Sequence, residues 1–151
     1  MSVQQGLAGR TFDPTPPQEV SRADVARFAA AVGDVDPVHV DVAVARERGH
    51  RDLPAPPTFP IVVAFDALQR LLADPSVGIE LRNVVHVEQR FEYTRPVYAG
   101  DVLTATLTVE SVRAAAGTDL IGNRIEITDG DGAHVCTARA SLAHKAPASA
   151  A

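Results

Sequence analysis

Apolar side chains are dense between Leu53 and Pro75, and their spacing predicts a helix. Placed at 3.6 residues per turn they leave almost no polar stripe, so other protein should surround this helix. Its apolar members are Phe59, Ile61, Val62, Val63, Phe65, Leu68, Leu71 and Leu72. The stretch between Pro60 and Pro75 is shorter than the roughly 20 residues that span a bilayer, which indicates a core helix of a soluble domain.

Prolines mark the start of this helix. Pro54, Pro56 and Pro57 exclude helix before Thr58, whose hydroxyl is predicted to cap the first turn. Pro60 suits that turn, because its missing N–H would have no intrahelical partner there. A helix N-terminus presents unpaired N–H groups and the positive end of the dipole, so we expect this one to face a functional site.

Two shorter helices are predicted before the core helix. Ser21 and Asp24 form a capping box that opens the first, and Gly33 ends it. Asp41 is predicted to cap the second, which runs to Arg48.

From Asn83 onward the apolar period changes to two, which is typical of half-buried strands. The residues expected on the buried face of the first strand are Val85, Val87, Gln89, Phe91 and Tyr93. Further strands are predicted over 103–110, 121–128 and 135–142, the last two joined by the turn 129–132. Helices followed by consecutive strands indicate an α+β fold, and a sheet curled around the apolar helix would bury it economically.

Length and composition narrow the class of protein. The 151 residues fit one domain with one core, and a net charge of -5 offers no basic surface for nucleic acid or anionic membrane. Cys136 is the only cysteine, which excludes an intrachain disulfide and is typical of a core residue. Residues 1–18 are expected to be extended, with an edge strand near Arg10 to Phe12, and 144–151 to be a disordered tail. No apolar secretory signal opens the chain, so we expect a cytoplasmic protein.

A candidate for chemistry lies between the first two helices, in the sequence Gly-Asp-Val-Asp-Pro-Val-His that begins at Gly33. Asp34 and His39 lie on a loop constrained by Gly33 and Pro37, where their side chains could converge. A carboxylate and an imidazole on one water could share its activation. The same residues also suit a structural role, with Asp34 at a helix end, Asp36 in an Asx turn and His39 on a loop.

This motif, with Ala45 after it, resembles the signature of MaoC-like (R)-specific enoyl-CoA hydratases and 3-hydroxyacyl thioester dehydratases. The segments APPTF and FEYTRPVYAGDVL agree with the family in order, and the resemblance covers most of residues 7–143. It is closest to the FAS1-like, MaoC N-terminal-type branch of actinobacteria. The resemblance implies a single hot-dog domain, a curved antiparallel sheet around one long helix, and a homodimer or a heterodimer with a related hot-dog subunit.

The resemblance also implies roles for individual residues. Asp34 and His39 would hold the water that is added to, or removed from, C3 of an acyl thioester. The backbone N–H of Thr58 or Phe59 would bind the thioester carbonyl, where negative charge develops. The implied substrate is a thioester of CoA or of acyl carrier protein whose chain runs along the core helix, and we expect no metal or other cofactor.

Two departures from the family pattern affect this prediction. Asp36 stands where the family usually has Asn, and a carboxylate close to Asp34 would raise the pKa of one of the two. Pro56-Pro57 stands where catalytic relatives carry His-Gly, and Pro57 has no N–H to donate. Several relatives with the proline version are non-catalytic halves, so the alternative is an acyl-binding subunit of a heterodimeric dehydratase. A thioesterase on the same fold is a third, weaker hypothesis.

Other polar residues are weaker candidates. His50 and Arg51 could meet the phosphates of a pantetheine-linked substrate, although a solvated loop is the simpler interpretation. Arg95 is predicted to anchor the turn before the second strand, Asp101 to be a turn residue, and His86 to be a surface or dimer-contact residue.

Overall fold

The computed structural model describes residue 3 and residues 5–145. Its helices and strands are, in chain order, η1 (Gln5–Leu7), β1 (Gln18–Glu19), α1 (Arg22–Val32), η2 (Pro37–His39), α2 (Val42–Glu47), α3 (Ile61–Ala73), η3 (Leu81–Asn83), β2 (Val84–Tyr93), β3 (Val102–Ala115), β4 (Thr118–Thr128) and β5 (His134–Lys145).

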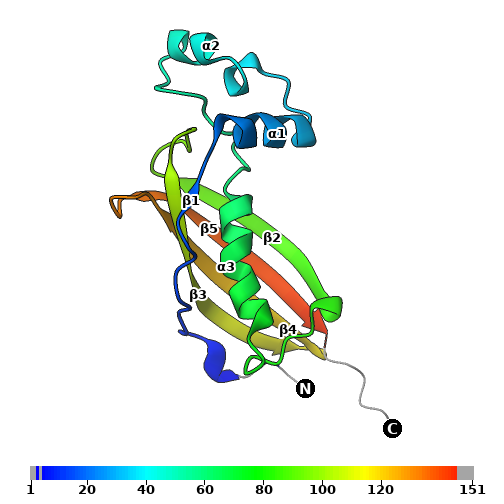
Figure 1. The fold of residues 1–151 in the computed structure, drawn as a ribbon. Helices are drawn as coiled ribbons and strands as arrows, with labels where there is room; N and C mark the ends of the chain where they lie inside the picture. The colour runs from blue at the N-terminus through cyan, green and yellow to red at the C-terminus, as the bar shows by residue number, and fades with distance from the viewer. Residues whose placement is uncertain (1–2, 4, 146–151) are drawn as a thin grey trace.

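The sheet is antiparallel and curls around α3 (Figure 1). Its strand order is β1-β3-β4-β5-β2, so β3, β4 and β5 form a meander while β2 returns to pair with β5 at the far edge. Helices α1 and α2 lie beyond the N-terminal end of α3 (Figure 1). The predicted α+β hot-dog architecture is confirmed.

Helix α3 packs one face on β3 and β4. Its buried residues are Val63, Ala64, Ala67, Leu68 and Leu71. The opposing strand residues that are almost fully buried are Leu103, Ala105, Leu107, Val109, Ile121, Ile125 and Ile127. The two alanines carry no bulk beyond Cβ, which lets the helix approach the sheet closely, and the branched strand residues fill the remaining volume.

The opposite face of α3 is only partly covered by the described residues. Val62 and Phe65 are 43% and 44% exposed, although the sequence pattern predicted a helix enclosed on nearly all sides. Strand β2 differs from its prediction in the same way, because Val85 and Val87 are exposed rather than buried. A register shift interrupts its pairing with β5 after His86, so the alternation predicted across β2 is broken. The chain therefore presents an apolar helix face and a sheet edge.

The start of α3 also differs from its prediction. Pro60 is the N-cap residue and no side chain caps the helix, so the capping role predicted for Thr58 is wrong. The Phe59 N–H donates instead to the Pro56 carbonyl, and the Ile61 N–H donates to the Thr58 carbonyl. These turns carry the chain into the helix.

The first two helices begin and end where the sequence predicts. Ser21 and Asp24 make both bonds of the capping box at the start of α1. Gly33 ends α1 in the left-handed conformation, at φ 73°, and Asp34 donates its N–H back to the Ala29 carbonyl. Asp41 caps α2 through two backbone N–H groups. The αL turn at Gly33 therefore sets where Asp34 leaves the helix.

The ends of the described chain need two corrections. The N-terminal segment contains the short 3₁₀ helix η1, and its predicted edge strand is a single bridge from Thr11 to Thr108. Strand β5 runs to Lys145, so His144 and Lys145 belong to the sheet and not to the predicted tail. Residues 146–151 of that tail lie outside the described residues.

The remaining composition-based predictions concern Cys136 and membranes. Cys136 is buried in β5, as predicted, and burial raises the pKa of its thiol to about 11. Within the described residues, no helix combines the length and the apolar character that crossing a bilayer requires.

Replacing Gly33 by Ala should destabilise the protein by roughly 1 to 2 kcal/mol, because the left-handed conformation disfavours a Cβ even where space is free. Gly6→Ala is the matched control, since its Cβ would also meet nothing within 4 Å and its φ is not positive. Urea unfolding of both variants measures the difference. Equal midpoints would contradict the role assigned to Gly33.

Candidate active site

The structure brings Asp34 and His39 together at the loop between α1 and α2. The Nε2 atom of His39 lies 2.9 Å from Oδ2 of Asp34, and Nδ1 of His39 lies 2.7 Å from the Pro54 carbonyl oxygen. His39 is only 6% exposed, whereas the Asp34 side chain is 31% exposed. The pair therefore has one buried partner held in place and one partner that solvent or a ligand can reach.

These contacts fix the orientation of the imidazole ring. A carbonyl oxygen only accepts, so the Nδ1–H of His39 donates to Pro54, and Nε2 faces the carboxylate of Asp34. A carboxyl group and an imidazole in this contact can exchange a proton with each other and with a bound molecule.

Asp36 orients the loop rather than sharing a proton with Asp34. Its N–H donates to Oδ1 of Asp34 at 3.1 Å, and its carboxylate caps η2 by accepting from the Val38 N–H at 3.0 Å. Arg48 donates to both carboxylate oxygens, at 2.8 and 2.9 Å. The Val38 N–H and the Arg48 guanidinium lower the pKa of Asp36, so the rise predicted for one of the two carboxyls is wrong for Asp36.

The pair opens into a cavity of about 650 Å³. The cavity is lined by the loop of Asp34 and His39, by Arg48 and His50 after α2, by Pro54, Ala55 and Pro57, and by the segment from Tyr93 to Val97. Sequence reasoning did not include Arg48 or Tyr93 in the site. No local sequence pattern marks Arg48, because its partner Asp36 lies 12 residues away in the chain.

The segment that leads into α3 borders the same cavity. The N–H of Phe59, one of the two predicted backbone donors, is bound to the Pro56 carbonyl at 2.9 Å. For the exposed Thr58 N–H, no acceptor is found among residues 3 and 5–145. The Tyr93 hydroxyl donates to the Pro57 carbonyl, which ties this segment to the end of β2. Of the two predicted donors, Thr58 is therefore the one with a free N–H in this part of the chain.

The two weaker candidates lie in different places. His50 lines the cavity of the dyad, with Nδ1 3.0 Å from the Tyr98 hydroxyl. Arg51 lies outside that cavity and forms an ion pair with Asp101 at 2.6 Å. Arg95 also binds the buried carboxylate of Asp101, at 2.8 Å, so it anchors the turn as predicted. Asp101 is thus more than a turn residue, because it holds two guanidinium groups.

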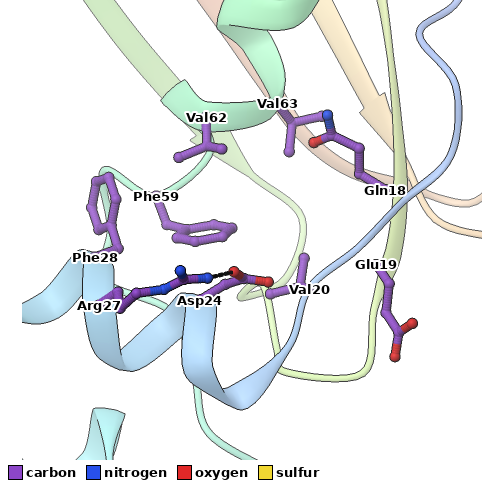
Figure 2. A pocket seen from close by; sticks show the side chains of 9 residues that line it. All are labelled: Gln18, Glu19, Val20, Asp24, Arg27, Phe28, Phe59, Val62 and Val63. Carbon is purple, nitrogen blue, oxygen red and sulfur yellow. Dashed lines mark hydrogen bonds and ion pairs between the residues drawn. The ribbon is translucent and has the colours of Figure 1, made fainter.

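A second cavity, of about 500 Å³, lies between α1 and the start of α3 (Figure 2). Phe28 and Phe59 meet edge to face there, with ring centroids 5.3 Å apart. Val62 and Val63 of α3 face the same space, and the ion pair of Arg27 and Asp24 lies at its border (Figure 2). These four apolar side chains share the lining with the polar Gln18 and Glu19.

The chemistry of the site is that of a proton donor and acceptor beside apolar space. Within the described residues, no three His, Cys, Asp or Glu side chains come close enough to hold a metal ion. The site can hold a water at Asp34, and it can move a proton through the pair.

Comparison with known proteins places this geometry in a family. Residues 7–138 match the family described as "FAS1-like, dehydratase domain region". The chain belongs to this family. Proteins described as UPF0336 are similar to this chain along nearly its full length. That of Leifsonia xyli subsp. xyli is 49% identical over 140 residues, covering 93% of this chain and 94% of its own. That of Streptomyces coelicolor is 43% identical over 146 residues, covering 97% of each.

Two solved structures share the fold and some of the sequence. One is a C-terminally truncated HadBC complex, a (3R)-hydroxyacyl-ACP dehydratase of Mycobacterium tuberculosis, with a TM-score of 0.82 and 31% identity over 91% of this chain and 96% of that one. The other is described as a MaoC-like dehydratase, with a TM-score of 0.85 and 31% identity over 93% of this chain and 43% of that longer chain. The predicted resemblance to MaoC-like dehydratases is confirmed.

Replacing Arg48 by Gln should raise the pKa of Asp36 toward its ordinary value of 3.8, because a cationic donor is lost. A carboxyl whose pKa is lower in the folded than in the unfolded state stabilises the fold above its unfolded pKa, and this stabilisation is lost as pH falls through the folded value. We therefore expect the Arg48→Gln variant to lose less stability than wild type between pH 5 and pH 2.5. A carboxyl NMR titration measures the pKa directly, and an unchanged value would contradict the ion pair.

Proposed function

We propose that this protein is a hydro-lyase that interconverts (3R)-hydroxyacyl and trans-2-enoyl thioesters by removing or adding water. The observation that carries the proposal is the hydrogen bond between Asp34 and His39 in a cavity next to apolar space. Membership of a dehydratase family supports the reaction class. The proposed substrate is a thioester of CoA or acyl carrier protein, and the proposed location is the cytoplasm.

The geometry suits the protons that this reaction moves. In the hydration direction, ionised Asp34 accepts a proton from water while the water oxygen bonds to C3. The electrons of the C2=C3 π bond shift toward the thioester carbonyl. Asp34 and His39 together then return one proton to C2. His39, held by Pro54, is the second ligand of the water and the proton partner of Asp34. The net change is the addition of H and OH across the double bond.

The growing charge on the thioester oxygen needs a hydrogen-bond donor. We propose the N–H of Thr58, because the N–H of Phe59 is bound within its own turn and Pro57 has none. The acyl chain would extend past Phe59 into the cavity between α1 and α3, along the apolar side chains of Phe28 and Val62. His50 would meet the pantetheine end of the substrate, because it lines the dyad cavity.

A second candidate function is that of an acyl-binding subunit without chemistry of its own. The observation that favours it is the segment Pro56-Pro57, which leaves fewer backbone donors at the start of α3 than a glycine would. The exposed Val62 and Phe65 and the sheet edge at β2 offer a surface for a related hot-dog subunit, and HadBC is itself a complex. The intact Asp34 and His39 pair favours the catalytic role. A thioesterase is a weaker alternative, which release of free thiol from acyl-CoA would reveal.

Asp34→Asn and His39→Ala should each lower the rate of crotonyl-CoA hydration by roughly 100-fold to 10,000-fold, because each removes one half of the proton-transfer pair. Loss of the enoyl thioester absorbance measures the rate, and the mass of the protein in solution is determined on the same sample. Asp131→Asn, in an exposed turn, is the matched control. A wild-type protein that turns over only with a co-expressed hot-dog partner would instead establish the subunit role.

Thr58→Pro should lower the turnover number by roughly 100-fold, because it removes the proposed backbone donor to the thioester oxygen. Thr58→Ala is the control, since it keeps the N–H and loses only the hydroxyl. Hydration kinetics on both variants, with thermal unfolding to verify the fold, separate the two groups. Equal turnover numbers in a folded Thr58→Pro protein would remove Thr58 from the site.

A further inference from the structure

Tyr93 lies where strand β2 ends and the dyad cavity begins. It is the last residue of the strand, and it lines the cavity together with Asp34, His39 and Pro57. Its hydroxyl donates to the Pro57 carbonyl, across a sequence separation of 36 residues. The side chain is 40% exposed, so a bound molecule can reach it.

The backbone near the dyad offers few donors. Pro56 and Pro57 have no N–H, and the Phe59 N–H is used inside its own turn. Thr58 keeps its N–H, but it is not among the residues that line the dyad cavity. Because backbone donors are few here, a side-chain donor is needed to stabilise a developing oxyanion.

The other side-chain donors of the cavity are bound to side chains. Arg48 is paired with a carboxylate, and Arg95 is paired with two. His50 is bound to a tyrosine hydroxyl, and the Thr94 hydroxyl lies 2.5 Å from a histidine nitrogen. The Tyr93 hydroxyl is bound to the neutral carbonyl of an exposed residue, which can exchange its donor for water at small cost. Among these donors, the Tyr93 hydroxyl is the uncharged one whose partner is a backbone carbonyl.

We infer that Tyr93 is a further catalytic residue. When substrate binds, the Tyr93 hydroxyl breaks its hydrogen bond to the Pro57 carbonyl and donates instead to the carbonyl oxygen of the acyl thioester. The Pro57 carbonyl is an acceptor of the same type as the thioester carbonyl, so it accepts the Tyr93 hydrogen bond until substrate binds. The inference rests on the proposed function, because it assigns a donor for that reaction. No bond is made or broken at Tyr93.

Electrostatics agree with this role. Burial raises the pKa of the Tyr93 phenol, so the group keeps its proton and remains a donor at any working pH. A neutral donor stabilises the oxyanion without taking a proton from the pair of Asp34 and His39.

The test measures carbonyl polarisation without turnover. In a His39→Ala background, trans,trans-hexa-2,4-dienoyl-CoA is bound and its absorbance is recorded, because a donor on the carbonyl shifts that band to longer wavelength. We expect a red shift that falls by at least half when Tyr93→Phe is added. Asp131→Asn, in an exposed turn outside the cavity, is the control and should leave the shift unchanged.

Kinetics on the otherwise wild-type protein complete the test. Tyr93→Phe should lower the turnover number for crotonyl-CoA on the order of 100-fold while KM stays within twofold. The inference would be overturned if the red shift is undiminished after Tyr93→Phe. It would also be overturned if the probe binds the His39→Ala protein without any red shift. Both outcomes hold even if crotonyl-CoA is hydrated. Failure of the probe to bind at all would overturn the proposed function and the inference with it.

Discussion

Burial of one face of α3 against β3 and β4 is the constraint on which the structure depends. The small residues Ala64 and Ala67 allow close approach, and the branched residues of the two strands fill the space. Because the helix axis is fixed by this packing, its N-terminal end is fixed too. The segment from Pro54 to Pro60 leads into that end from α2, and its Pro54 carbonyl accepts a hydrogen bond from His39.

The site is therefore assembled from two segments that the core holds in place. Gly33 turns the chain out of α1, and Asp36 caps the turn that carries His39. Pro54 comes from the segment before α3, and it is joined to the β2–β3 connection through a bridge to Tyr98. Distant parts of the sequence thus meet at one imidazole ring, which is why it is nearly buried and still faces a cavity.

Much of this could be predicted from the sequence where the cause is local. The capping box at Ser21, the αL turn at Gly33 and the span of α3 depend on neighbours within a few residues, and the structure confirms them. The spacing of Asp34 and His39 indicated that their side chains could converge, and the structure has them in contact. Alternation in β2 could not show that this strand lies at an edge, so the exposure of Val85 and Val87 was missed.

Interactions between distant residues were beyond sequence reasoning. Arg48 reaches Asp36 only after α2 has folded back, and this ion pair reverses the expected effect of a second carboxylate on the pKa. Tyr93 meets Pro57 because β2 ends beside the start of α3, which depends on the strand order. The hydroxyl of Thr58 was expected to cap the helix, but turns closed by backbone bonds occupy that position.

The two contacts that orient the dyad end on the main chain. His39 donates to the Pro54 carbonyl, and Asp34 accepts from the Asp36 N–H. Nearly any residue at position 54 has the same carbonyl, and any residue except proline at position 36 has the same N–H. These two contacts therefore place no requirement on the side chain at either position. An inserted or deleted residue in either segment would move the peptide groups themselves, so we infer that selection acts on the lengths of these loops more than on their composition.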